Sequence, residues 1–133
     1  MKKIYLVFLT LLCLSCSKDD ESSKSAIAIN PPAWVQGNWA YSDFEEEGPI
    51  FKINSNDVVF VVSTTELSYK GQLEGMAKAG ADVSVDEEIS EGKYLVTFNM
   101  SQGVTQSYSF SKIDDSTINW DNQGMGSVEL TRQ

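Results

Sequence analysis

The residue types that most often carry out catalysis are scarce in this chain. It has no histidine, and its only two cysteines, Cys13 and Cys16, lie near the N-terminus. Histidine is the commonest general base, and the cysteine thiolate is a frequent nucleophile. The segment Gly124-Met125-Gly126 has no helical pattern after it, so it does not match a phosphate-binding loop. We therefore expect a protein that is not an enzyme and that holds no cofactor.

Carboxylates are the remaining groups that could do chemistry. They cluster as Glu45-Glu46-Glu47, Asp86-Glu87-Glu88 and Asp114-Asp115. A calcium site needs six or more oxygen ligands from a preformed loop, and none of these runs has the alternating spacing that such a loop uses. All three fall in expected loops or at strand ends. Solvated turns are the favoured interpretation over a catalytic acid–base pair or a calcium site, and no metal site is predicted.

The N-terminus has the pattern of an export signal. Lys2 and Lys3 precede an apolar run over residues 4–14 that only Thr10 and Cys13 interrupt. A transmembrane helix needs about 20 apolar residues, so this run is too short to span a membrane. Its length fits the apolar region of a signal peptide.

The end of this run resembles the lipobox of bacterial lipoproteins. Small Ser15 comes directly before Cys16, although Cys13 stands where that family usually has leucine. The resemblance implies that the chain is cut before Cys16 and that the thiol of Cys16 carries the lipid anchor. Multiple acyl chains are needed for stable anchoring. The alternative is an ordinary secretory signal.

The residues after Cys16 predict a tether. Residues 17–25 are all polar, and such a stretch cannot bury enough surface to offset the entropy of ordering it. Lys18, Asp19 and Asp20 resemble the surface-export signal of one large Gram-negative lineage, which implies an outer-membrane lipoprotein exposed on the cell surface. The alternative is a polar tether that has no role in export. The expected division is 1–15 signal peptide, 16–33 acylated cysteine and flexible tether, and 34–133 β domain.

The charge balance limits the partners. The chain has 10 basic and 19 acidic side chains, a net charge of −9, which becomes −11 when Lys2 and Lys3 leave with the signal. This balance opposes nucleic acid as a partner. The expected partners are the membrane, through Cys16, and a small apolar ligand; the oligomeric state is left open.

From Trp34 onward the apolar residues follow a period of two. In the clearest stretch, Tyr94, Val96 and Phe98 share one face, which is typical of an antiparallel sheet with one buried face. Turn residues separate nine candidate strands, at 37–44, 49–53, 57–62, 66–73, 81–89, 93–100, 104–110, 117–120 and 127–132. Glycines interrupt the only helical pattern, at 72–79, so a single turn or loop is expected there.

Gly37-Asn38-Trp39 at the first strand and Arg132 at the last resemble the lipocalin and lipocalin-like families. The resemblance spans residues 34–132 and implies that Trp39 plugs the closed end of a barrel with Arg132 packed over it. The domain lacks the length, the C-terminal helix and the disulfides of full lipocalins. The predicted fold is an all-β antiparallel meander of about eight to nine strands, forming a small lipocalin-like barrel or a strongly curled sheet.

The alternation also predicts which side chains point inward. They are Trp39, Tyr41, Phe51, Ile53, Phe60, Val62, Leu67, Tyr69, Val83, Val85, Tyr94, Val96, Phe98, Tyr108, Phe110, Ile118, Trp120, Val128 and Leu130. So many bulky groups favour a filled core. If a pocket exists, its polar groups are expected to be Tyr41, Tyr69, Tyr94, Gln106 and Tyr108.

Two functions therefore stay open. The first is a surface-anchored binding module that holds a small apolar or amphipathic ligand inside the barrel without catalysis. The alternative is an interaction or structural lipoprotein with a filled core, which binds a protein or glycan through an outer face that includes Val59, Val61 and Leu95. A ligand is expected to enter opposite Trp39, past Glu45-Glu46-Glu47-Gly48, whose charge favours neutral or cationic molecules.

Overall fold

The computed structural model describes residues 27–122 and 124–133. Cys16 and the export signal at 18–20 lie outside the described residues. The signal, anchor and surface-export predictions therefore stay predictions.

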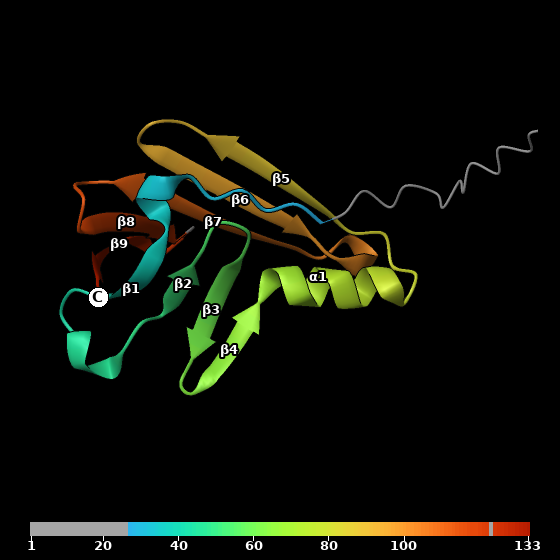
Figure 1. Cartoon of the computed structure of the whole chain (residues 1–133), viewed down its shortest axis with the longest axis horizontal. Coiled ribbons are helices and arrows are strands. Elements are labelled where there is room, and N and C mark those ends of the chain that lie inside the picture. The colour runs from blue at the N-terminus through green and yellow to red at the C-terminus, as the bar shows by residue number, and fades with distance from the viewer. Residues whose placement is uncertain (1–26, 123) are drawn as a thin grey trace, which may run out of the picture.

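The described chain forms one sheet of nine antiparallel strands (Figure 1). The strands are β1 (Gly37–Tyr41), β2 (Phe51–Ile53), β3 (Val58–Val62), β4 (Thr65–Ser68), β5 (Ser84–Ile89), β6 (Lys93–Asn99), β7 (Thr105–Lys112), β8 (Thr117–Asn122) and β9 (Gly126–Arg132). Their order in the sheet is β4-β3-β2-β1-β9-β8-β7-β6-β5, so the first and last strands pair in its middle. The strongly curled antiparallel meander predicted from the sequence is confirmed.

Alternation decides which face of the sheet is buried. On β6, Tyr94, Val96 and Phe98 are buried while the residues between them are not. Phe51 of β2 lies opposite both Trp39 of β1 and Phe60 of β3, which extends the apolar face across neighbouring strands. Because the sheet curls around this face, it becomes the inner face and holds the hydrophobic core.

Two residues predicted to point inward are largely exposed. Val62 is 49% exposed and Leu67 is 37% exposed. Both lie on the β3–β4 hairpin at one edge of the sheet. β4 is an edge strand, and the β2–β3 register ends at Phe60, so each of the two residues has a neighbouring strand on one side only and inward alternation does not guarantee burial there.

The connection between the two edge strands contains a real helix, α1 (Tyr69–Lys78), which corrects two predictions. The strand expected at 66–73 ends at Ser68, and the expected turn at 72–79 is helical. Ser68 caps the helix by accepting a hydrogen bond from Gly71 N at 2.9 Å. Asp57, directly before β3, accepts from Lys70 N at 2.9 Å and from the Ser68 hydroxyl. This cap comes from the fold, and it offsets the poor helix propensity of the two glycines.

The packed domain begins earlier than the expected boundary at residue 34. Ile29 belongs to the core cluster, and Val35 in the short 3-10 helix η1 (Ala33–Val35) is fully buried. Glu87 of β5 fastens this segment by accepting hydrogen bonds from Asn30 N at 2.8 Å and from Asn30 Nδ2 at 3.2 Å. In Figure 1 the segment leads past β6 toward η1, which contacts β7 before β1 starts.

Candidate functional site

The structure brings Trp39 and Arg132 together. They are register partners on β1 and β9, and Arg132 Cζ lies 4.4 Å from the centroid of the Trp39 ring. Trp39 is fully buried, and its Nε1 donates to Val35 O at 2.7 Å. The Arg132 guanidinium donates to three backbone carbonyls, those of Asp115, Trp34 and Gln36. We call this arrangement the closed end: Trp39, Arg132, and residues 33–37.

The structure explains why the Gly-x-Trp motif has glycine at its first position. Gly37 has φ +144°, a conformation that other residues rarely adopt. A Cβ at this position would also collide with the Nη1 atom of Arg132. Gly37 therefore lets Arg132 approach the start of β1 closely.

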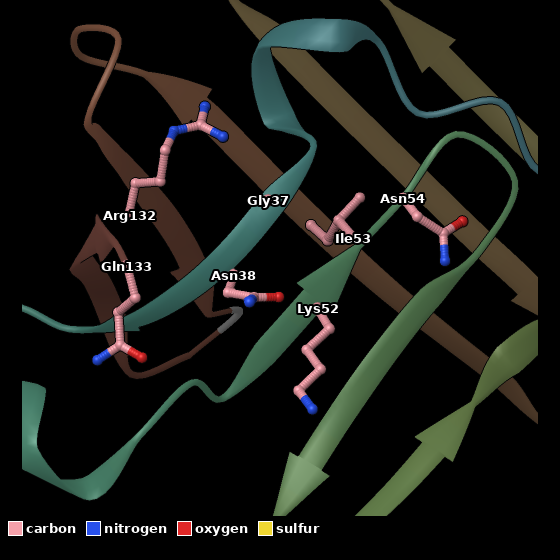
Figure 2. Close-up of a pocket in the computed structure, with 7 residues that line it drawn as sticks. All are labelled: Gly37, Asn38, Lys52, Ile53, Asn54, Arg132 and Gln133. Carbon is pink, nitrogen blue, oxygen red and sulfur yellow. The ribbon is translucent and has the colours of Figure 1, made fainter.

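A hollow of about 330 Å³ lies beside the closed end, lined by Gly37, Asn38, Lys52, Ile53, Asn54, Arg132 and Gln133. Figure 2 shows that its two cations do not converge, because the Arg132 guanidinium points toward the turn before β1 and Lys52 points away from it. Lys52 makes an ion pair with Glu66, and Arg132 is held by the carbonyls named above. This hollow therefore lacks the free convergent charge of an anion site.

Aromatic rings pack the inner face of the sheet. The Phe51 ring centroid lies 5.3 Å from that of Phe60, 5.2 Å from Tyr108, 5.1 Å from Phe110 and 5.0 Å from Trp120. Most of these pairs are edge-to-face, the geometry that aromatic pairs prefer. The ring of Tyr69, from α1, stacks on Phe98 at 4.2 Å, which joins the helix to this cluster.

Three of the predicted pocket tyrosines use their hydroxyls inside the protein. The Tyr69 and Tyr108 hydroxyls lie 2.6 Å apart, and the Tyr94 hydroxyl donates to Glu87 Oε1 at 2.7 Å. Burial raises the pKa of all three tyrosines above the ordinary value, because it penalises the phenolate. These three residues are part of the packed core.

Gln106 shares a polar hollow of about 250 Å³ with one of these tyrosines, Tyr108; the hollow is lined by Thr105, Gln106, Ser107, Tyr108, Trp120, Asp121 and Asn122. The hollow lies where the pairing of β7 with β8 stops, since Phe110 and Trp120 are the last register partners in that direction. The carboxylate of Asp121 already accepts hydrogen bonds from the hydroxyls of Ser109, Ser111 and Ser127.

Tyr41 lies at the far end of β1 from the closed end. It lines a hollow of about 280 Å³ with Glu47, Gly48, Pro49, Ile50, Phe60, Val61, Val62 and Ser63. We call this the Tyr41 hollow. It contains apolar side chains from three segments, which are β1, the link into β2, and the end of β3. The structure therefore brings Tyr69, Tyr108 and Gln106 together, while Tyr41 lines a separate hollow with mainly apolar neighbours.

The β1–β2 link adds acidic groups beside the Tyr41 hollow. It contains the short 3-10 helix η2 (Glu45–Glu47) and lines a second hollow of about 420 Å³ with Ser42, Asp43, Phe44, Glu46 and Glu47. We call residues 43–47 the acidic loop. Glu47 lines both hollows, so they adjoin. We call the Tyr41 hollow and the acidic loop together the loop end.

The loop end also has a feature that alternation did not reveal. Phe44 is 58% exposed in the acidic loop, and Val62 is 49% exposed beside the Tyr41 hollow. The only sequence signal for Phe44 is a large apolar residue directly before three glutamates in an expected loop. Exposed apolar groups of this size often mark interaction sites when they gather together.

Within residues 27–122 and 124–133, no three His, Cys, Asp or Glu side chains are grouped to hold a metal ion. Over the same residues, no helix has the length and apolar character needed to cross a membrane.

Comparison with known proteins gave no relative. The chain matches no protein-family model, no curated protein and no solved structure.

Proposed function

We propose that the protein is a lipid-anchored, lipocalin-like lipoprotein of the bacterial outer membrane, exposed on the cell surface, that binds a partner without catalysis. We further propose that binding takes place at the loop end. The observation that carries this proposal is the filled inner face, where Phe51 has four aromatic neighbours within 5.3 Å. Space inside the sheet is taken by side chains, which favours a partner bound at the surface.

The lipocalin-like assignment is supported by the closed end and limited by the sheet. The Gly37-x-Trp39 motif and the Arg132 stack on Trp39 match what the resemblance implies. In contrast to a closed barrel, β4 and β5 are the two edges of the sheet, and α1 connects them. We therefore propose no central ligand cavity of the kind that the family resemblance would imply.

A small apolar or amphipathic ligand is the second candidate partner. The Tyr41 hollow, at about 280 Å³, is close to the lower limit of about 300 Å³ for small-molecule sites. Such a ligand would enter at the end opposite Trp39, in keeping with the sequence expectation. It would lie against Tyr41 and Val62 and not among the buried tyrosines.

The anchor part of the proposal depends on Cys16, with Lys18, Asp19 and Asp20 as the export signal. Cys16→Ser removes the thiol that would be acylated. We expect this variant to lose all labelling by a palmitate analogue in growing cells. Undiminished labelling of the variant would contradict the anchor.

Residue-resolved NMR tests where binding occurs. We would titrate the full-length Cys16→Ser protein with hexanol, a small neutral apolar probe, and follow its amide signals. We expect saturable shifts near Tyr41, Ile50 and Val62. Shifts concentrated at Tyr69, Tyr94 and Tyr108 would support a ligand inside the sheet instead and overturn the surface proposal.

The chain offers a matched pair of variants for this titration. Val62 and Ile113 are both 49% exposed, but Val62 lines the Tyr41 hollow and Ile113 follows β7 near the closed end. We expect Val62→Asp to abolish the hexanol shifts and Ile113→Asp to preserve them. Equal loss in both variants would contradict a specific site at the loop end.

A further inference from the structure

We infer that the loop end binds a cationic, apolar segment of a partner protein, in which lysine or arginine side chains lie next to apolar ones. This inference rests on the proposed function and adds the chemical class of the partner. It depends on two neighbouring features of different character, the apolar lining of the Tyr41 hollow and the carboxylates of the acidic loop.

The apolar feature extends beyond the hollow itself. Tyr41, Ile50 and Phe60 line the hollow, and each is only partly buried although it packs against the core. Phe44 and Val62 place further apolar surface around them, at 58% and 49% exposure. A single small molecule in about 280 Å³ would leave Phe44 uncovered. A chain segment is long enough to cover the hollow and Phe44 together.

The acidic feature sets the charge of that segment. Asp43, Glu46 and Glu47 line the two adjoining hollows, and neither hollow has a lysine or arginine in its lining. Among the side chains that the structure describes, the ion pairs are Lys52–Glu66 and Lys112–Asp115, and neither involves Asp43, Glu46 or Glu47. A cation from a partner would meet these carboxylates without displacing a basic side chain of this protein.

The charge of the whole chain acts in the same direction. The net charge is −9, and a field of one sign attracts oppositely charged partners and speeds their encounter. An anionic segment would be repelled both by this field and by the local carboxylates. Electrostatic complementarity of this kind contributes mainly specificity and association rate, while the apolar contacts hold the complex.

Calorimetric titration of the full-length Cys16→Ser protein with three capped peptides tests the inference. One peptide alternates leucine with lysine, and its counterparts carry serine or glutamate in place of lysine. We expect the lysine peptide to bind most tightly and the glutamate peptide not to bind. The preference for lysine should weaken as salt is added, because the carboxylates involved are exposed.

Paired charge variants separate local contacts from the overall field. Glu46→Gln with Glu47→Gln should weaken lysine-peptide binding by about threefold to tenfold, as expected for two exposed charge contacts. Asp82→Asn with Glu91→Gln removes the same charge from exposed positions that line neither hollow, and it should leave the affinity nearly unchanged. Equal weakening in both double variants would overturn the inference, because binding would then follow net charge alone.

The outcomes also separate this inference from the proposed function. If hexanol binds at Tyr41 and the lysine and serine peptides bind equally, the inference of a cationic partner is wrong, but the proposal of a surface site is still supported. If hexanol binds and no peptide does, the inference that the partner is a protein segment is wrong, and a small ligand becomes the favoured partner. If neither hexanol nor any peptide binds at the loop end, both proposals fail.

Discussion

The two ends of the curled sheet use charged and aromatic residues in opposite ways. At the closed end, the Arg132 guanidinium is held by three backbone carbonyls and by the ring of fully buried Trp39. At the loop end, Phe44 is 58% exposed, and the carboxylates of Asp43 and Glu46 are at the surface. One end satisfies its groups within the protein, while the other leaves them available to a partner.

The topology explains why the ends can differ. In an antiparallel meander, alternate connections lie at the same end of the sheet, so the β1–β2 and β3–β4 links meet at the loop end. The segment before β1 and the end of β9 meet at the other end, where Arg132 joins them. The strands provide a rigid support, and loops on such a support commonly carry function.

Removing one large side chain from each end should give the largest contrast. Trp39→Ala deletes a fully buried ring and should lower the free energy of unfolding by about 3–5 kcal/mol. Phe44→Ala removes an exposed ring and should change the free energy of unfolding by about 0.5 kcal/mol or less. Urea unfolding of both variants measures the difference. Comparable losses would mean that Phe44 supports the fold as much as Trp39 does.

Two glycine substitutions should give a smaller contrast with opposite signs. Gly37→Ala places a Cβ against Arg132 in a backbone conformation that alanine rarely adopts, and we expect a loss of about 1–3 kcal/mol. Gly75→Ala, in α1, meets open space and removes a poor helix former, so we expect a gain of about 0.5–1 kcal/mol. Thermal unfolding reports both changes. A Gly37→Ala protein as stable as the parent would mean that the closed end adapts to a side chain.

The strands were predictable from the sequence, and the helix was not. Strict alternation in stretches such as Tyr94 to Phe98 depends only on one buried face, which every strand of a one-sided sheet shares. The helix depends on Asp57, which lies directly before β3 and bonds to the N-terminus of α1, and on burial of Tyr69 and Leu73. These contacts are tertiary, so local propensity in a segment with two glycines could not reveal them.

The candidate site was predictable only in part. The Gly-x-Trp motif led to Trp39 and Arg132, and the structure places them in contact. Alternation gave the inward direction of Tyr69, Tyr94 and Tyr108 but not their partners, so it could not distinguish a pocket lining from a core. Exposure of Phe44 depends on the course of the β1–β2 link, which has no periodic pattern to read.

Coupling between residues should give the smallest effect and the most direct test of the contrast between the ends. Trp39→Leu and Arg132→Met both put an apolar side chain in place of the original one, and a double-mutant cycle of the two cancels the separate cost of each change and isolates the contact between the cation and the ring. With Arg132 Cζ at 4.4 Å from the ring centroid, we expect a favourable coupling of about 0.5–2 kcal/mol. The control cycle joins Arg132→Met with Phe44→Leu at the other end, and it should be additive within about 0.3–0.5 kcal/mol. Urea unfolding of the single and double variants gives both values. Additivity in the first cycle would mean that Arg132 supports the closed end through its three carbonyl partners alone, and the resemblance to the lipocalin-like families would then lose its energetic support.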